Sequence, residues 1–282
     1  MLPEMISQPN DDEVIKTPMA RNQNAEWAQP QEVPAPEALL VHYLPGRSKR
    51  LVVSLAGVGR ARTRVPPMEF LGTASDDNTN HVLFISDTTR SWLNGPGITK
   101  FIIGLIARYR KQHDIQDLVL MGNSMGGFSA LVLADLIPTD TVISFAPQFS
   151  ANPDIVPTER RWFHFRKHIA EWKHPTVGSI QKANTNYFIF HGDDAEEIPH
   201  WVRFPQARNV HHLIVKGEGH NIARLLRRRN ALTPMFRSAV DNKPRRVRKI
   251  LELALNDDSR KVLRRVQYET DYPEVINHCA LT

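Results

Sequence analysis

The sequence predicts an α/β protein with a mostly parallel central sheet and helices on both faces of that sheet. From residue 38 onward, short apolar runs rich in β-branched residues recur between turn residues, and amphipathic segments separate several of these runs. A chain of 282 residues is also long enough for one domain with a substantial core. The expected strands span residues 38–43, 50–55, 81–86, 117–121, 141–145, 186–190 and 211–215.

Several segments between and after the expected strands have helical periodicity. Residues 98–113 carry one apolar stripe with basic residues beyond it, which predicts an amphipathic helix on one face of the sheet. Residues 125–136 are mostly apolar and predict a deeply buried helix. Beyond residue 220, we expect helices in the segments IARLLRRRNAL, RVRKILELAL and SRKVLRRV.

Composition divides the chain into three parts. Residues 1–36 are rich in proline, Gln, Asn and Glu and have no sustained apolar period, so we expect a flexible arm there. Residues 37–240 are expected to form the main domain, and residues 241–282 a basic helical extension. Within the main domain, residues 149–185 form an insertion with several aromatic side chains. This insertion is either a small lid over a pocket or a surface excursion anchored by its aromatic residues.

The composition is typical of a globular protein. Hydrophobic residues make up 41% and charged residues 23% of the chain, which excludes fibrous and wholly disordered classes. The single cysteine, Cys279, cannot form an internal disulfide. The first residues lack the basic start and apolar run of a secretory signal, and no stretch approaches the roughly 20 apolar residues of a membrane span. We therefore expect a cytoplasmic protein.

The basic character of the chain is concentrated near its C-terminus. The formal net charge is +6, and residues 224–265 alone hold 14 Lys or Arg against 4 Asp or Glu. Such a segment could contact an anionic membrane surface, a nucleic acid or an acidic substrate, or it could be a solvated helical face. No aromatic interleaving or nucleic-acid motif accompanies it, so we expect no sequence-specific nucleic-acid binding.

The strongest functional pattern is LVLMGNSMGGFSALVLADL, where Gly122, Ser124 and Gly126 match G-x-S-x-G between an expected strand and an expected helix. A sharp strand-to-helix turn exposes the serine hydroxyl, and glycines beside it avoid collisions with neighbouring backbone. The following helix aims its positive end at a developing oxyanion, and the N–H of Met125 is the first expected oxyanion donor. Ser124 is thus a predicted nucleophile. The alternative is a connecting turn in which Ser124 caps the helix.

In this context, residues 38 to about 235 resemble the α/β-hydrolase superfamily, whose members follow the chain order nucleophile, acid, histidine. The resemblance implies a catalytic histidine after the last strand and before a helix, which is the position of His220 in HHLIVKGEGHNIARLL. An imidazole can take the serine proton during attack and return it to the leaving group. The stretches SWLN and SFAPQ also resemble, loosely, hydrolase-like proteins associated with bacterial surface polysaccharides.

The acid of this arrangement is expected in the segment NYFIFHGDDAEEIPHW, which supplies four carboxylates after an expected strand. A carboxylate there would orient the imidazole and stabilise the imidazolium. Asp194 is the first choice and Asp193 its rival, while Glu196 and Glu197 stay open. In the superfamily the acid commonly lies three residues after the glycine, and Ala195 occupies that position here.

Other loops after expected strands supply further site residues. The stretch LAGVG offers Ala56 and Gly57 as backbone donors of a second oxyanion contact, or it is an ordinary glycine turn. Trp92 and Gln148 follow two other strands, at the edge where parallel strands face a ligand crevice. We expect both to contact substrate, although Trp92 equally fits a loop anchor.

Together these patterns predict a serine hydrolase or acyltransferase that uses an acyl-enzyme to act on an ester or thioester of a carbohydrate or lipid. The sequence has no dinucleotide-binding fingerprint and no cluster of metal-ligating residues, so we expect no cofactor and no metal ion. The alternative is a noncatalytic hydrolase-like protein that holds a partner with its crevice or its basic C-terminus.

Overall fold

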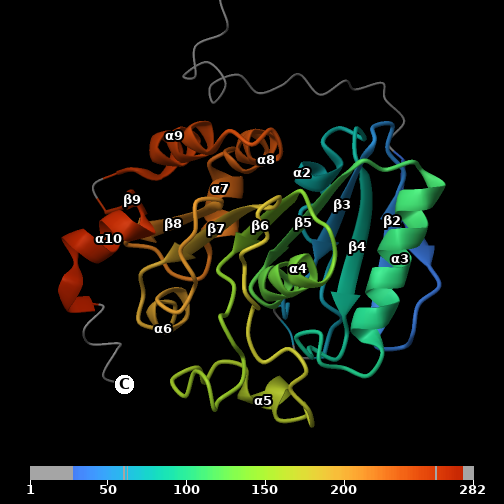
Figure 1. Cartoon of the computed structure of the whole chain (residues 1–282), viewed down its shortest axis with the longest axis horizontal. Coiled ribbons are helices and arrows are strands. Elements are labelled where there is room, and N and C mark those ends of the chain that lie inside the picture. The colour runs from blue at the N-terminus through green and yellow to red at the C-terminus, as the bar shows by residue number, and fades with distance from the viewer. Residues whose placement is uncertain (1–27, 60, 62, 258, 276–282) are drawn as a thin grey trace, which may run out of the picture.

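Figure 1 shows the computed structural model, which describes residues 28–59, 61, 63–257 and 259–275. The described strands form one nine-stranded sheet in the order β1-β2-β4-β3-β5-β6-β7-β8-β9. Strands β3 to β8 run parallel, whereas the pairings β1–β2, β2–β4 and β8–β9 are antiparallel. The strands are β1 (Gln31–Val33), β2 (Leu39–Leu44), β3 (Arg50–Leu55), β4 (His81–Asp87), β5 (Asp117–Asn123), β6 (Thr141–Phe145), β7 (Asn186–Gly192), β8 (Val210–Lys216) and β9 (Lys261–Arg264).

Helices cover both faces of this sheet, as the sequence predicts. Helices α3 and α4 pack on one face, and α2, α7, α8 and α9 pack on the other (Figure 1). Fully burying one aliphatic or aromatic side chain between these layers stabilises the fold by about 1.5–3 kcal/mol. The helices are α2 (Leu71–Ser75), α3 (Ile98–Gln112), α4 (Met125–Leu136), α5 (Phe163–Arg166), α6 (Ile198–Trp201), α7 (Ile222–Arg228), α8 (Leu232–Val240), α9 (Pro244–Leu255) and α10 (Arg265–Asp271).

The inner strands are apolar on both faces because each lies between two layers of helices. In β4, all residues are buried, with Val82 and Phe84 in one core cluster and Leu83 and Ile85 in the other. Such nearly continuous apolar runs identify inner strands in a sequence. All the strands expected from the sequence are present, and so are the two expected helices at α3 and α4.

Two segments differ from expectation, and both lie at sheet edges. Gln31–Val33 belongs to the expected flexible arm but forms β1 against β2, while residues 1–27 lie outside the described residues. The segment SRKVLRRV, expected as a helix, contains β9. There, Val262 and Leu263 pack on opposite faces of the sheet beside β8, which covers an otherwise unpaired strand. Pairing across the sheet outweighs the local helical periodicity.

The basic C-terminal segment is packed into the main core in its described part. In α9, Val247, Ile250 and Leu251 are buried in the same cluster as the inner strands. Its basic side chains lie on the opposite side, where Arg245 and Lys249 are exposed. Cys279 lies outside the described residues. None of the described helices is both long enough and apolar enough to cross a membrane.

The carboxyl ends of the parallel strands meet at one edge of the sheet. The register pairs Leu55 with Gly122 and Asn123 with Phe145, so β3, β5 and β6 end at the same level. Loops that follow such strands converge on a common crevice. The expected site residues all lie in these loops or at their borders.

Candidate active site

Ser124 occupies a strained turn between β5 and α4. Its backbone has φ 57° and ψ −121°, a combination that a residue with a side chain adopts only when its surroundings enforce it. A Cβ atom at Gly122 would lie 2.2 Å from the Gly126 carbonyl carbon, and one at Gly126 would lie 2.0 Å from the Leu55 carbonyl oxygen. Gly122 is therefore required for α4 to begin so close to the end of β5, and Gly126 for the helix to pass so close to β3.

Two successive hydrogen bonds connect the Ser124 hydroxyl to buried side chains. Gln148 Nε2 donates to Ser124 Oγ at 3.0 Å, and Trp92 Nε1 donates to Gln148 Oε1 at 3.2 Å. The side chains of Trp92 and Gln148 are fully buried, and neither residue lines the cavity at Ser124. In this arrangement the two expected substrate contacts orient the serine instead. Since its oxygen accepts from Gln148, the Ser124 hydroxyl keeps its own hydrogen for donation.

His220 lies in the loop between β8 and α7, and it lines the same cavity as Ser124. Its Nδ1–H donates to Glu197 Oε1 at 2.8 Å, which leaves Nε2 available as an acceptor. The Trp162 ring packs beside the imidazole, with 6.4 Å between ring centroids. Within the described residues, no hydrogen bond joins Ser124 to His220. Catalytic hydrogen bonds of this kind are often long without substrate.

The structure gives His220 a different carboxylate partner from the one favoured in the sequence analysis. Glu197 precedes α6, and its side chain is 1% exposed. Asp194 Oδ1 instead accepts the backbone N–H groups of Glu196 and Glu197, at 3.2 and 2.9 Å. Asp193 accepts from the N–H of Gly217 at 2.7 Å and from the Tyr268 hydroxyl at 3.1 Å. Asp194 therefore shapes the turn that presents Glu197 to the imidazole.

Electrostatics keep Glu197 ionised. Burial alone would raise the pKa of its carboxyl, but the hydrogen bond from His220 and nearby positive charge lower that pKa to about 2. Part of this charge comes from Arg161, whose Nη1 donates to the same oxygen, Oε1, at 2.7 Å. The Arg161 nitrogen also lies 3.5 Å from His220 Nδ1. The carboxylate is thus shared between an imidazole and a guanidinium.

Arg161 belongs to the insertion at residues 149–185, which is tied to the site by a buried charge network. The guanidinium also binds both oxygens of Glu159: Nε donates to Oε1 at 3.1 Å and Nη2 donates to Oε2 at 2.5 Å. His200 Nε2 donates to Glu159 at 2.8 Å. Burial alone would raise the pKa of Glu159, but its bonds to His200 and Arg161 lower it to about 2. Sequence reasoning missed this network, because no local pattern brings the insertion to α6.

The expected oxyanion donors differ in their availability. The N–H of Met125 begins α4 and therefore has no acceptor within the helix. The N–H of Ala56 donates to the Ile85 carbonyl at 2.9 Å, so it is already engaged. The N–H of Gly57 donates to Glu69 Oε2 at 3.2 Å. The Glu69 side chain thus occupies the N–H of Gly57 that an oxyanion would need as a donor.

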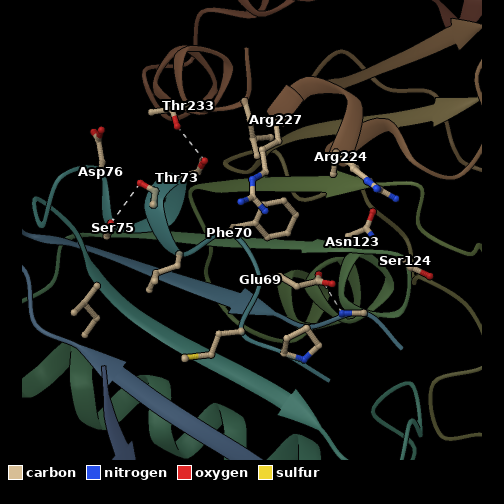
Figure 2. A pocket seen from close by; sticks show the side chains of 18 of the residues that line it. Glu69, Phe70, Thr73, Ser75, Asp76, Asn123, Ser124, Arg224, Arg227 and Thr233 are labelled. Carbon is tan, nitrogen blue, oxygen red and sulfur yellow. Dashed lines mark hydrogen bonds between the residues drawn. The ribbon is translucent and has the colours of Figure 1, made fainter. Parts of the chain in front are cut away.

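Glu69 is a second carboxyl beside the site, and sequence reasoning did not single it out. Burial raises its pKa to about 7, although the Gly57 hydrogen bond and the charge of His220 act in the opposite direction. Figure 2 shows Glu69 between Phe70 and Ser124 on the wall of the pocket, with its bond to the Gly57 N–H. The charge on this wall therefore changes near neutral pH.

The cavity that joins these residues has a volume of about 2210 Å³. Ser124, His220 and Trp162 line one part of it. The loop before α2, α2 itself, α7 and α8 are among the segments that line the rest. Two buried polar atoms of lining residues, Asn123 Oδ1 and Trp162 Nε1, have no hydrogen-bond partner within the described residues. No three described His, Cys, Asp or Glu side chains group as metal ligands.

Known proteins resemble this chain in structure rather than in sequence. No family model and no curated protein matches the chain. Among solved structures, an α/β serine hydrolase homologue from Coxiella burnetii covers 74% of this chain and 98% of its own, at 14% identity and a TM-score of 0.49. The assignment of the fold rests on the chain's own architecture. Its mostly parallel sheet between two layers of helices, with a serine turn between β5 and α4, is that of the α/β-hydrolase fold.

Two further structures share the α/β-hydrolase fold with this chain. The capsule O-acetyltransferase of Neisseria meningitidis serogroup A has a TM-score of 0.54 and 15% identity, and the match covers 77% of this chain and 97% of that one. Est1E from Butyrivibrio proteoclasticus has a TM-score of 0.52 and 12% identity, covering 75% and 99%. At these identities the likeness concerns the fold.

Proposed function

We propose that this chain is a serine hydrolase or acyltransferase that acts on an ester or thioester through a covalent acyl-enzyme. The proposal rests on one arrangement above all. Ser124, held in a strained turn, shares a cavity with an imidazole whose Nδ1–H is bound by the buried carboxylate of Glu197. A turn that only connects β5 to α4 would need neither the strained backbone of Ser124 nor the ionised Glu197 bound to His220.

The proposed reaction assigns a role to each group. Ser124 Oγ attacks the substrate carbonyl carbon while His220 Nε2 accepts the hydroxyl proton. The N–H groups of Met125 and Gly57 stabilise the oxyanion of the tetrahedral intermediate. As the intermediate collapses, the alcohol or thiol leaves with the proton from His220. Water or an acceptor alcohol then attacks the acyl-enzyme, with His220 acting again as base. Glu197 stabilises the imidazolium throughout.

Two local movements precede this chemistry. The Ser124 hydroxyl turns toward His220 Nε2, with Gln148 still available as a donor to its oxygen. The Glu69 carboxyl releases the Gly57 N–H, because one N–H cannot serve Glu69 and a reaction oxyanion at full strength. Side-chain rotations of this size are faster than typical turnover.

For the substrate, we propose an acylated carbohydrate or lipid. The capsule O-acetyltransferase of Neisseria meningitidis has the same fold, which supports transfer to a sugar hydroxyl as an alternative to hydrolysis. A cavity of about 2210 Å³ exceeds what a small acyl ester needs and leaves room for an acceptor.

A fluorophosphonate probe followed by intact-mass measurement tests the proposal. The wild-type protein is expected to gain one phosphonyl adduct, Ser124→Ala none, and His220→Ala to react at least about 100-fold more slowly. Ser129→Ala is the matched control: Ser129 lies on the same helix, and its hydroxyl donates to the Met125 carbonyl at 2.8 Å. Labelling that persists in Ser124→Ala would overturn the assignment of the nucleophile.

A noncatalytic binding protein is the second candidate. The observation in its favour is that Ser124 bonds to Gln148 rather than to His220 while Glu69 accepts from Gly57. The same experiment separates the two. An unlabelled wild-type protein that also fails to release the chromophore from short nitrophenyl esters would favour the binding protein.

A further inference from the structure

The wall of the cavity beyond the serine carries an imbalance of charge. Two of its cations have acidic partners: Arg237 lies within 2.7 Å of Asp76, and Lys243 lies 3.0 Å from Asp241. Within the described residues, no ion pair or hydrogen bond engages the guanidinium groups of the lining residues Arg64, Arg224 and Arg227. Unpaired cations that line a cavity attract an anionic ligand.

Arg224 and Arg227 stand on a fixed support next to the base. They are three positions apart on α7, so their side chains leave neighbouring points on one face of the helix. The opposite face holds Ile222, Leu225 and Leu226 in the core, which anchors α7 to the sheet. The helix begins two residues after His220. Figure 2 shows both arginines extending from α7 into the pocket, Arg224 toward Asn123 and Arg227 toward Phe70.

The facing wall has a different chemistry. Val65, Met68 and Leu71 are among the exposed large apolar side chains of the described residues, at 49%, 38% and 43%, and all three line this cavity. Glu69 also lines the cavity, between Phe70 and Ser124 in the view of Figure 2. An anionic group is therefore drawn toward α7 and kept from Glu69, while an uncharged carbon skeleton can cover the apolar side chains. A ligand held in this way has its neutral acyl end beside Ser124.

We propose that Arg224 and Arg227 form a subsite for a phosphate group carried by the substrate. The planar guanidinium presents paired donors that match phosphate oxygens, and two of them one helical turn apart suit a dianion better than a single carboxylate. This inference rests on the proposed ester or thioester chemistry, and it names the substrate class as a phosphate-bearing acyl compound. The phosphate can come from an acyl carrier or from a phosphorylated sugar.

Calorimetric titration at low salt tests the subsite without turnover. The probes are coenzyme A as a phosphorylated carrier, glucose 6-phosphate as a phosphorylated sugar, and inorganic phosphate. We expect one of the first two to bind, and Arg224→Gln and Arg227→Gln each to raise its Kd by about 10- to 100-fold. Arg228→Gln is the control, because Arg228 is an exposed neighbour outside the cavity lining. Its Kd should stay within about twofold of the wild type.

Kinetics provide a second readout. If the carrier is the source of the phosphate, the wild type should have a higher kcat/KM with acetyl-CoA than with S-acetyl-N-acetylcysteamine, a thioester without phosphate. The ratio of the acetyl-CoA value to the S-acetyl-N-acetylcysteamine value should fall about tenfold in each arginine variant. Equal Kd values in wild type, Arg224→Gln and Arg227→Gln, or no binding of any probe, would overturn the subsite. Fluorophosphonate labelling of Ser124 together with no binding of any probe would support the proposed hydrolase and contradict the phosphate subsite. Arginine-dependent binding of a probe without labelling of Ser124 would support the subsite and contradict the proposed chemistry.

Discussion

The turn that carries Ser124 and the loop that carries Glu197 hold their functional groups by different physical means. The backbone of Ser124 is fixed by close contacts within its turn and by the passage of Gly126 against β3, where a single methyl group would collide with backbone. Glu197 is fixed by charge and hydrogen bonds from separate segments: Asp194 shapes its turn, while Arg161 and His220 bind its carboxylate.

The Ser124 turn and the Glu197 loop therefore respond differently to substitution. A steric constraint acts through direct contact, so a substitution at the turn displaces the Ser124 backbone and the segments that touch it. A buried charge network is coupled, because removing one member leaves the others without compensation. The carboxylate of Glu197 therefore depends directly on the insertion at residues 149–185, through its ion pair with Arg161.

The acid loop offers the largest expected effect. Glu197→Gln should lower kcat/KM for a short ester by about 1,000-fold or more, because the amide neither holds the imidazole in the required tautomer nor stabilises the imidazolium. Asp194→Asn should cost less than about tenfold, since the side-chain oxygen of Asn can still accept the two backbone N–H groups. Steady-state kinetics with both variants measure the contrast. A larger loss in Asp194→Asn than in Glu197→Gln would return the acid role to Asp194.

The coupling through the insertion predicts a smaller effect on stability. Arg161→Gln leaves Glu159 and Glu197 less compensated and should lower the free energy of unfolding at pH 7 by about 3 kcal/mol. The control Arg160→Gln, at an exposed neighbouring position, should change it by less than about 0.5 kcal/mol. Urea unfolding monitored by fluorescence measures both.

The pH dependence of the stability lost in Arg161→Gln shows whether Arg161 stabilises the protein through its charge or through packing. The carboxyls of Glu159 and Glu197 have pKa values of about 2 in the folded protein, in place of 4.5. The stability that they contribute is therefore present above about pH 4.5 and lost as pH falls toward 2. The difference between wild type and Arg161→Gln should therefore shrink from pH 5 to pH 3. A difference that stays constant over this range would mean that Arg161 acts through packing.

Much of the fold could be predicted because its signals are local. The inner strands are continuous apolar runs bounded by turn residues, and α3 has one apolar stripe, so each is recognisable within its own segment. The exception is instructive. The segment SRKVLRRV, residues 259–266, has helical periodicity, but its residues 261–264 pair with β8. Nothing within the segment itself reveals that an unpaired sheet edge lies beside it.

The same distinction applies to the site. Gly122, Ser124 and Gly126 form a pattern within a few residues, and the structure places them in the expected turn. The partner of His220 was not predictable with the same certainty, because four carboxylates lie within five residues and only the path of the chain selects Glu197. Arg161 and Glu69 reach the site from loops whose course depends on tertiary packing.

The smallest expected effect concerns Glu69, whose carboxyl accepts a hydrogen bond from the Gly57 N–H. Its pKa of about 7 means that the carboxyl is mainly protonated below that pH and charged above it. A charged carboxylate repels a developing oxyanion and competes more strongly for the Gly57 N–H, so wild-type kcat/KM for a neutral ester should fall above pH 7, by about 1–2 kcal/mol or 5- to 30-fold. Glu69→Gln should keep its activity there, whereas the exposed control Glu171→Gln should follow the wild-type profile. A high-pH decline that persists in Glu69→Gln would show that Glu69 does not compete for the oxyanion contact.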